Sequence, residues 1–386
     1  MRDNVSTLLK YQCCGCTACF ATCPTDAIRM KADEEGYLYP VIDSSLCINC
    51  GRCLDVCKDI QFYDEKQHVF CCKNNDDTLR MRSSSGGLFS SLAEDFLDRG
   101  GFVCAVGYSV DCSECLHKII DTTEELDDLR RAKFVQSNKY DVFEQVKKEL
   151  LNDRLVLFCG TPCEVGGLRQ YLREDYANLL TVDIICGCVS SPMVYERYIM
   201  YLEEKYQSII KSVNFKDKRK GWNNEGKAIA IEFANGKEYY NSIFDDDYCV
   251  SFHSRYNIRP SCFHCKYRSI KRVADITLGD FWGVEHYVDD VLDKIGISLA
   301  ITNSSIGKRV MQRLKGIEMI EIINMDIQEY SNKYNCRINQ NPLEPMELNR
   351  VQFYADITSK PFDEVSEKYL KEIKELRKRQ KLIKYE

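Results

Sequence analysis

Eight cysteines near the start of the chain repeat one spacing, and this repeat restricts what the segment can fold into. Each set follows the pattern C-x2-C-x2-C-x3-C, with Pro24 after the first set and Lys58 after the second. The sets are Cys13, Cys16, Cys19 and Cys23, then Cys47, Cys50, Cys53 and Cys57. Three closely spaced thiolates on a tight loop can hold one side of an inorganic cubane.

The fourth cysteine of each set stands at the start of a helix and points away from its own loop, so it ligates the other cluster. The spacing therefore predicts a bacterial-type ferredoxin module with two [4Fe–4S] clusters. The first cluster is assigned to Cys13, Cys16, Cys19 and Cys57, and the second to Cys47, Cys50, Cys53 and Cys23. Backbone amides of these loops are expected to donate hydrogen bonds to the sulfurs.

Two structural zinc sites are the alternative to iron–sulfur clusters. Zinc prefers two separated cysteine pairs to four cysteines within eleven residues, so the spacing favours iron. Cys14 lies beside Cys13 but off the spacing, and it is expected to be a bystander.

Composition excludes several other classes of protein. A chain of 386 residues with 44% apolar and 29% charged residues is globular and long enough for two or three domains. The net charge of −6 argues against a nucleic-acid partner, and the apolar runs are too short to span a bilayer. Because the start lacks an apolar signal segment, the 22 cysteines indicate metal ligands in a reducing cytosol, and we expect a cytoplasmic protein.

After a polar connector at 61–78, the chain alternates between strand and helix patterns. Strands are expected at 101–108, 155–159, 179–185 and 300–302, and helices at 88–97, 165–172 and 306–314. Pro162 suits the first turn of the second of these helices. This alternation predicts an α/β body (α+β for the whole chain) with a substantial parallel component. The chain then ends in a helix over 363–386 with an apolar stripe of Val365, Tyr369, Ile373, Leu376 and Ile383. The basic residues around this stripe indicate either a solvated helix or a docking surface for an acidic electron carrier.

Three further features of the body could bear chemistry. The loop from Ser83 to Gly87 enters a helix, so it can either bind an anion such as a phosphate or simply cap the helix. Cys163 and Cys186 follow predicted strands, at the edge where α/β sheets bind ligands. With the pair Cys262 and Cys265 they form a possible third four-cysteine site; alternatively they are buried small apolar residues.

Several motifs are missing from the sequence. It contains no dinucleotide-binding glycine fingerprint, no phosphate-binding P-loop, no nucleophile elbow and no zinc-protease motif. The five histidines are scattered and form no ligand set. The pair Phe281-Trp282 could pack over a planar ring but is more typical of a core.

Several motifs together resemble the β-subunit family of coenzyme F420-reducing hydrogenases and dehydrogenases, over nearly the whole chain. The motifs are Ser83–Gly87, Lys133-Phe134-Val135-Gln136-Ser137, Gly160-Thr161-Pro162-Cys163, Cys186 with Ser191-Pro192, Cys262-x-x-Cys265 and Ala274–Gly283. The family also includes F420-linked formate dehydrogenase and glutamate synthase partners, and a plant reductase of 7-hydroxymethyl chlorophyll.

The resemblance implies an iron–sulfur flavoprotein that binds FAD without the dinucleotide fingerprint. It implies a third [4Fe–4S] cluster at Cys163, Cys186, Cys262 and Cys265, close to the flavin. It places eight residues near FAD: Ser85, Gly86, Gly87, Lys133, Gln136, Ser137, Thr161 and Asp280. Lys133 is the candidate for a catalytic charge. The family usually reads Cys-His-Gly where this chain has Cys186-Gly187-Cys188, so Cys188 competes with Cys186 as a ligand; Glu164 stands where Gln is usual.

We therefore predict four segments and a redox function. The segments are 1–62 (ferredoxin module), 63–150 and 151–335 (two parts of the flavin domain, the second with the third cluster) and 336–386 (helical tail). Electrons are expected to pass between a ferredoxin or another carrier protein, the clusters and FAD, with hydride exchange with an organic acceptor or coenzyme F420. The alternatives are an electron-transfer subunit that serves a catalytic partner chain, and a redox sensor. A homo-oligomer is also possible.

Overall fold

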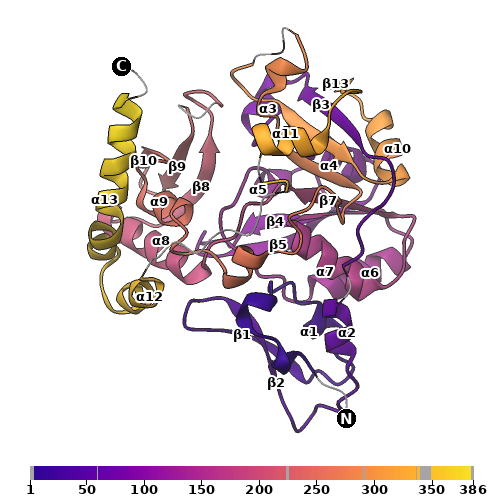
Figure 1. Ribbon diagram of the computed structural model, residues 1–386, viewed down its shortest axis with the longest axis horizontal. Coiled ribbons are helices and arrows are strands. Elements are labelled where there is room, and N and C mark those ends of the chain that lie inside the picture. Colours follow the sequence, from indigo (N-terminus) through magenta and orange to yellow (C-terminus); the bar gives the residue numbers. More distant parts are fainter. Residues whose placement is uncertain are drawn as a thin grey trace.

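The structure is a computed structural model that describes residues 4–58, 60–222, 226–289, 291, 293–335, 337–339 and 349–383, with the backbone alone for 378–383. Figure 1 shows the first residues as a small unit below a larger α/β body, with the C-terminal helices on one side of that body. Within the described residues, no helix has both the length and the apolar character needed to cross a bilayer.

The N-terminal module is built from two short helices and a hairpin, and its internal repeat is also a repeat of backbone conformation. Its elements are η1 (Val5–Thr7), η2 (Lys10–Gln12), α1 (Ala18–Ala21), β1 (Ile28–Ala32), β2 (Leu38–Ile42) and α2 (Arg52–Lys58). Gly15 and Asn49 occupy the same place in the two cysteine loops, with φ of +70° and +53°. Thr17 and Gly51 also match, at +70° and +78°. Both cysteine loops therefore turn in the same way.

An eight-stranded mixed sheet forms the centre of the body. Its order is β13 (Ile317–Glu321), β3 (His68–Asn74), β12 (Ser298–Thr302), β11 (Ile276–Asp280), β7 (Leu179–Ile184), β6 (Val156–Gly160), β4 (Phe102–Tyr108) and β5 (Cys115–Ile120). Strands β4, β6, β7 and β11 are parallel, whereas β12, β13 and β5 run against their neighbours. The expected strands at 101–108, 155–159, 179–185 and 300–302 are confirmed, as is the parallel component.

The prediction of a polar connector at 61–78 was wrong, because β3 lies inside this segment and pairs with both β12 and β13. The short run from Val69 to Cys72 is sufficient for a strand that is buried on both faces. Phe70 and Cys72 join the core on one face, and Val69 and Cys71 join the core on the other.

Helices cover both faces of the large sheet. On one face lie α3 (Asp77–Met81), α4 (Leu88–Asp98), α5 (Leu126–Leu129) and α10 (Ser305–Arg313), and on the other lie α6 (Val142–Leu151), α7 (Pro162–Leu172) and α11 (Ile327–Lys333). The expected helices at 88–97, 165–172 and 306–314 are confirmed, and α7 begins at Pro162 as predicted. Val5, Ala18, Ile28 and Val56 of the N-terminal module share one apolar cluster with α6 and α7. The module and the body are therefore packed together through a common core.

A second, three-stranded sheet was not foreseen from the sequence. Its order is β10 (Glu238–Ser242), β9 (Ala228–Phe233) and β8 (Ile210–Asp217), and it packs with α8 (Pro192–Tyr206), α9 (Asp247–His253), α12 (Arg350–Ser359) and α13 (Phe362–Ile383). Two short 3-10 helices, η3 (Pro260–His264) and η4 (Val284–His286), complete the described elements. The expected terminal helix is α13.

The predicted apolar stripe of α13 is correct only in its first half. Val365 is buried, and Tyr369 and Ile373 pack partly against the same core. Leu376 is half exposed, although α13 still contacts α9 nearby, where Lys374 pairs with Asp247. The side chain of Ile383 and residues 384–386 lie outside the described part.

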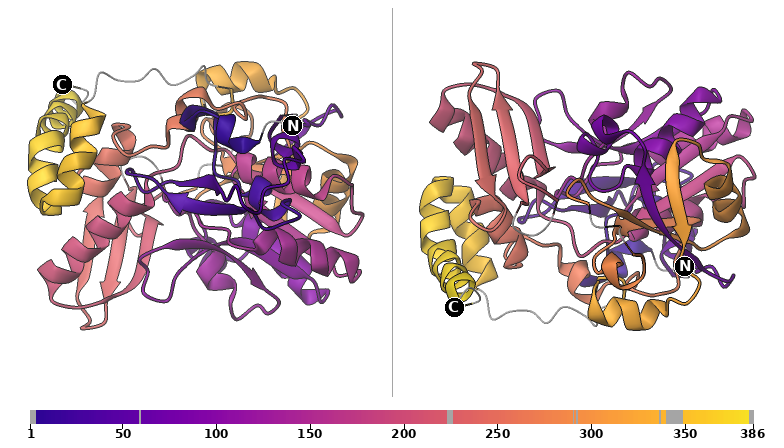
Figure 2. Two further views of the ribbon diagram at one scale, coloured as in Figure 1. Left: turned by 90° about the horizontal axis from the view of Figure 1, so that it is seen from below. Right: turned by 90° about the horizontal axis from the view of Figure 1, so that it is seen from above.

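The hairpin β1–β2 anchors the N-terminal module on the body (Figure 2). The hydroxyl of the fully buried Tyr37 donates to the carbonyl oxygen of Asn257 at 2.6 Å. Gly36 has a φ of +80°, and a Cβ there would lie 2.4 Å from the Cβ of Met193. Arg350 of α12 pairs with Glu35 at 2.5 Å. The turn of the hairpin is thus held by α8, α12 and the segment before η3.

Candidate thiol-lined redox site

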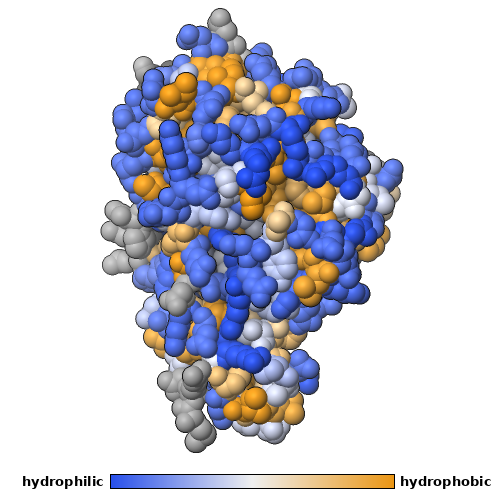
Figure 3. Space-filling view, turned by 90° about the vertical axis from the view of Figure 1, so that its right-hand side faces the viewer, coloured by the Kyte–Doolittle hydropathy of each residue, from blue (hydrophilic) through white to orange (hydrophobic). Residues whose placement is uncertain are grey.

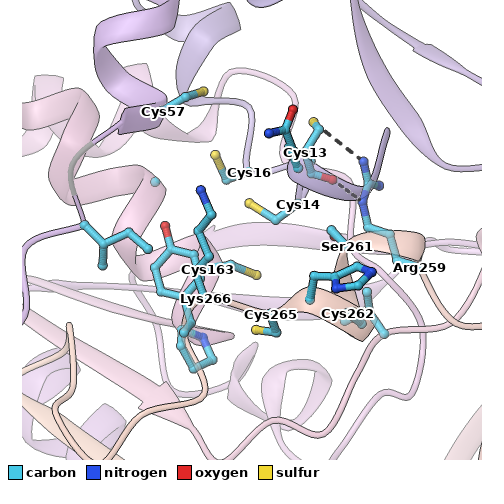
Figure 4. Close-up of a pocket in the computed structure, with 18 of the residues that line it drawn as sticks. Cys13, Cys14, Cys16, Cys57, Cys163, Arg259, Ser261, Cys262, Cys265 and Lys266 are labelled. Atoms are coloured by element: carbon cyan, nitrogen blue, oxygen red, sulfur yellow. Dashed lines mark hydrogen bonds between the residues drawn. The ribbon is translucent and has the colours of Figure 1, made fainter. Parts of the chain in front are cut away.

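A pocket lies where the N-terminal module meets the body, and thiols from five parts of the chain line it (Figure 4). They come from the first cysteine loop, the end of α2, the turns after β6 and β7, and the η3 segment. The thiols are those of Cys13, Cys14, Cys16, Cys19, Cys57, Cys163, Cys186, Cys188, Cys262 and Cys265. Two of the three predicted ligand sets therefore face one common space.

The first predicted set includes cysteines that are distant in sequence but close in the fold. Cys57, at the end of α2, lies within electrostatic reach of Cys13 and Cys19. Burial, together with the nearby thiols of Cys13 and Cys53, raises the pKa of Cys57 to about 11. Cys16 packs against α7 so closely that a Cβ at Gly167 would lie 2.6 Å from the Cβ of Cys16. We call these four residues, Cys13, Cys16, Cys19 and Cys57, the inner set.

The second predicted set lies further from the body, and we call Cys47, Cys50, Cys53 and Cys23 the outer set. Cys53 is near Cys50, and its sulfur accepts hydrogen bonds from the backbone amides of Val5 and Leu54. The sulfur of Cys23 accepts a hydrogen bond from the Ala27 amide at 3.3 Å. Amide donors to sulfur were expected from the sequence. Ile48, between two outer cysteines, is 63% exposed, so this loop faces solvent.

The four cysteines of the third predicted set converge from separate loops. Cys163 is the second residue of α7, and its sulfur lies 3.1 Å from the hydroxyl of Thr161. Cys186 lies near Cys163, Cys262 and Cys265. Burial, together with nearby Cys163 and Cys265, raises the pKa of Cys262 to about 12. Such raised pKa values mean that these thiols keep their protons when no metal is bound. A cationic iron core would bind them as thiolates and release the protons.

The surroundings of this third set fit a negatively charged group. Arg268 donates from Nη2 to the carbonyl of Gly187, while its Nε and Nη1 are buried without a partner among the described residues. Its charge lowers the pKa values of both Cys265 and Cys188, although burial dominates and raises them. Backbone amides of Tyr267 and Arg268 donate to Cys265, and that of Val189 donates to Cys262. A cluster held by four thiolates is negatively charged, and the unpaired N–H groups of Arg268 would donate to it.

Cys188 is a fifth thiol at this site. It lies near Cys186 and Cys262, and burial raises its pKa to about 12. Cys186 and Cys188 therefore both lie beside Cys262. In the described part of the chain, no three His, Cys, Asp or Glu side chains are arranged around a single metal ion.

Cys14, expected to be a bystander, lies between the inner set and the third set. Its thiol interacts with those of Cys16 and Cys163, and Figure 4 shows it between them. The amide of Gln136 donates to the carbonyl oxygen of Cys14 at 2.9 Å, and Arg259 contacts Cys13. Sequence reasoning missed Arg259 and Arg268 because neither belongs to a spacing pattern.

A second group of candidate residues lies at the carboxyl end of β11, with the loop before α4. Asp280 pairs with Lys216 at 2.6 Å, and the ammonium of Lys218 donates to the carbonyl oxygen of Ser85 at 3.0 Å. Burial lowers the pKa of Lys218 to about 7 and that of Lys227 to about 8. Lys218 forms no ion pair with a carboxylate of the described residues. This edge therefore concentrates positive charge that is only partly compensated.

The loop before α4 is itself tightly held. The hydroxyl of Ser85 donates to Ile297 O at 2.6 Å, and the amide of Gly86 donates to Ser298 Oγ at 2.9 Å. A Cβ at Gly86 would lie 2.3 Å from Cys72 O, which only glycine avoids. Gly87 caps α4 in the left-handed region with φ +88° and no side-chain hydrogen bond. The hydroxyl and amide considered for anion binding are thus engaged with β12.

The remaining predicted cofactor residues are spread along neighbouring strand ends. Lys133 donates to the carbonyls of Asp128 and Arg130, both at 2.7 Å, and burial lowers its pKa to about 8. Ser137 lies in a buried network, 3.0 Å from Glu164 Oε1 and 2.9 Å from His117 Nδ1. Thr161 caps α7.

The aromatic pair that follows β11 divides between two environments. Phe281 is fully buried in the core. Trp282 stacks on Trp222, with ring centroids 4.3 Å apart. The ammonium of Lys227 also lies over the ring of Trp282, 4.0 Å from its centroid.

Comparison with known proteins gives matches to two family models and to solved structures. Residues 153–328 match the family model for the C terminus of the beta subunit of coenzyme F420 hydrogenase/dehydrogenase, and residues 12–59 match a 4Fe-4S dicluster domain. Among solved structures, the chain is similar to one from the F420-reducing [NiFe] hydrogenase complex of Methanosarcina barkeri, with 14% sequence identity and a TM-score of 0.45. That match covers 82% of this chain and 93% of the other. No curated protein matches the chain.

The two matched ranges contain all twelve predicted cluster ligands, and together they span more than half of the chain. The dicluster match supports iron–sulfur clusters rather than zinc in the N-terminal module. Residues 153–328 thus match the C-terminal domain of the β subunit of coenzyme F420 hydrogenase/dehydrogenase, and residues 12–59 match a 4Fe-4S dicluster domain.

Proposed function

We propose that this chain is an iron–sulfur flavoprotein that relays electrons between a carrier protein and an organic acceptor or coenzyme F420. The observation that carries this proposal is the sequence of thiols from the solvent-facing outer set, through the inner set and Cys14, to Cys163 and its neighbours. A structural role alone does not require three ligand sets arranged in a series.

The proposal assigns each cofactor to a set of residues. The inner, outer and third sets would each hold one [4Fe–4S] cluster, and the carboxyl edge of the sheet would hold FAD. When bound, the clusters would carry single electrons, while FAD could take up electrons singly or as a hydride. We propose the boundaries 1–62 for the ferredoxin module, 63–150 and 151–335 for the two parts of the flavin domain, and 336–386 for the helical tail.

The charged edge beside Asp280 supports a site for FAD. Lys218 and Lys133 satisfy their ammonium groups with backbone carbonyls, which leaves their positive charge uncompensated. Phosphate oxygens are the natural counter-charge for such donors, and the two phosphates of FAD would supply them. Lys133 is our candidate for a positive charge near the flavin ring.

The chain's own residues would bind, orient and shield these groups. Arg268 would donate its orphaned N–H groups to the third cluster, and the buried pair Lys139–Glu164, at 2.9 Å, would hold the α7 turn that presents Cys163. Trp282 on Trp222 would exclude water beside Asp280.

Anaerobic purification with quantification of iron, sulfide and flavin tests this proposal. About twelve iron and one flavin per chain are expected from three cubanes plus FAD. Cys265→Ala should reduce the iron to about eight, whereas Cys14→Ala should leave it at about twelve. Cys186→Ala compared with Cys188→Ala identifies which of these two thiols is the fourth ligand. Wild-type protein with eight iron would remove the third cluster.

The flavin site has its own test. Lys218→Met is expected to lower flavin content at least tenfold while iron content stays at the wild-type level. Lys220→Met is the matched control, because Lys220 is an exposed lysine on the same segment. If Lys218→Met retains its flavin, this edge of the sheet is not the site. Reduction of bound flavin by reduced ferredoxin and by reduced F420 then compares the two sources of electrons.

A second candidate is an electron-transfer subunit that has no substrate of its own. The matching family model is described as that of a β subunit, which favours a partner chain. A stable partner that co-purifies, combined with no turnover by the isolated chain, would favour this candidate.

A further inference from the structure

Arg259 is a fully buried arginine whose hydrogen bonds converge on the inner cysteine loop (Figure 4). Its Nε donates to the carbonyl oxygen of Cys13 at 2.9 Å, and Nη2 donates to the sulfur of Cys13 at 3.8 Å. Nη1 donates to Oε1 of Gln136 at 2.7 Å, and Nη2 also donates to Leu38 O at 3.0 Å. The guanidinium therefore connects the inner loop, the hairpin and the body.

No carboxylate of the described residues pairs with this guanidinium. Its other neighbours are the rings of Tyr39 and Tyr37, with centroids 4.4 and 5.2 Å away. Burying an unpaired cation is costly, so such cations usually occur beside a negative group. Among the described residues, the group that donates or accepts directly at this guanidinium and would become strongly negative is the sulfur of Cys13 with the cluster that it would ligate.

The outer loop has no equivalent of Arg259 among the described residues. Cys47, which matches Cys13 in the repeat, donates through its sulfur to Oδ1 of Asn49 at 3.7 Å. Arg52 lies on the same outer loop but is exposed, where water screens its charge. The two cluster sites thus differ by one buried positive charge.

We propose that Arg259 is the charge partner of the inner cluster and holds its reduction potential above that of the outer cluster. A cubane held by four thiolates is negatively charged and gains one more negative charge on reduction. A buried cation that donates to a ligand sulfur therefore stabilises the reduced form more than the oxidised form. The added electron then favours the cluster that faces the body. This inference depends on the proposed inner ligand set.

The test is an anaerobic redox titration of the iron-loaded full chain, monitored by electron paramagnetic resonance. Arg259→Gln should lower one midpoint potential and leave the others unchanged. The electron-sharing equilibrium between the inner and outer clusters should change about tenfold, because Arg259→Gln removes one charged hydrogen bond to the sulfur of Cys13. A tenfold change corresponds to about 59 mV for a one-electron couple. Arg52→Gln is the matched control and should change no midpoint.

Two further variants keep the proposal testable if Arg259→Gln does not retain its iron. Arg259→Lys keeps the charge but loses the forked geometry, so the same midpoint should fall by a smaller amount. Gln136→Glu would place a carboxylate against Nη1 and neutralise Arg259, so that midpoint should fall again. If the electron-sharing equilibrium between the two clusters stays within twofold of wild type in the iron-loaded variants, the proposed role of Arg259 is wrong. Wild-type protein that lacks the inner cluster's iron would instead overturn the ligand set.

Discussion

The two cysteine loops of the N-terminal module have the same spacing and the same turns but face different surroundings. Cys14 and Ile48 hold equivalent positions in the repeat. Cys14 lies against Cys16 and Cys163 in the interface, whereas Ile48 is 63% exposed. Figure 3 shows apolar side chains at the surface of the lower end of the molecule, where the module lies. One loop is therefore built to contact this chain, and the other is open to a different molecule.

This contrast shows how two loops with the same sequence spacing become different in their surroundings. The repeat alone makes the two loops equivalent, and the body removes that equivalence by burying one of them. The buried side is rich in arginine: Arg259, Arg268 and Arg272 all line the pocket between module and body. Buried charge is expected to make this side sensitive to substitution, while the exposed loop should tolerate it.

The largest difference in the free energy of unfolding is expected between substitutions of Arg272, which is buried beside the pocket, and of its exposed neighbour Lys271. Arg272 forms a buried ion pair with Asp183 at 3.0 Å, with both side chains at most 2% exposed. Arg272→Met would leave Asp183 uncompensated and should lower the free energy of unfolding by about 3–5 kcal/mol. Lys271 pairs with Asp64 on the surface, and Lys271→Met should cost less than about 0.5 kcal/mol. Denaturant unfolding of both variants measures the difference, and equal losses would contradict it.

The equivalent turn positions provide a second comparison. Gly15→Ala should cost about 2 kcal/mol or more, because alanine is strained at positive φ and its Cβ would lie 2.8 Å from Nη1 of Arg259. Asn49→Ala at the same place in the outer loop should cost about 1 kcal/mol, since the backbone strain and the loss of a weak hydrogen bond from the Cys47 sulfur are not joined by a steric clash with an arginine. The measurement is thermal unfolding of the iron-loaded protein. If Asn49→Ala is the more damaging change, the inner loop is not the more constrained one.

Acid should act on the body rather than on the module, because none of the five histidines lies in residues 1–62. Burial lowers the pKa of His117 to about 4, so the unfolded chain binds the extra proton below about pH 6.5. Stability therefore falls as the pH falls, by about 1.3 kcal/mol between pH 7.5 and 5.5 for this residue alone. His117→Gln should reduce that slope in denaturant titrations at the two pH values. His286→Gln, at an exposed histidine, is the control.

The smallest effect is expected at the outer loop. Ile48→Asp should leave the unfolding free energy within about 0.5 kcal/mol of wild type, because the side chain is already exposed. If a carrier protein docks there, electron entry from reduced ferredoxin should slow about two- to fivefold, measured by stopped flow. Val110→Asp, at a fully exposed position on the body, is the matched control. An unchanged rate would show that the carrier protein does not dock at Ile48.

Local patterns predicted much of the fold. The strands around Leu157 and Leu180 and the helices at α4, α7 and α10 were expected from short apolar runs and helical periodicity. The strand β3 was missed because it pairs with β12 and β13, which lie far away in sequence. The sheet β8–β10 was missed although its three strands follow one another in the chain. Leu376 was misjudged because periodicity shows which face of a helix is apolar but not how completely other elements cover each residue of that face.

For the candidate site, spacing predicted the cysteines of the dicluster module, and family resemblance added the third set. The contacts of Arg259, the orphaned donors of Arg268 and the position of Cys14 could not be read from any spacing. Each depends on side chains that the fold brings together from separate segments, as Arg259 and Cys13 or Cys14 and Cys163 show.

The sequence by itself determined that two iron–sulfur loops precede an α/β body, because ligand spacing and apolar periodicity are local properties of the chain. Only the tertiary structure decided which loop faces inward, which arginine is buried beside it and which unpatterned thiol lies between the ligand sets. These are consequences of how the module docks on the body, since the docking removes water from one loop and leaves it around the other.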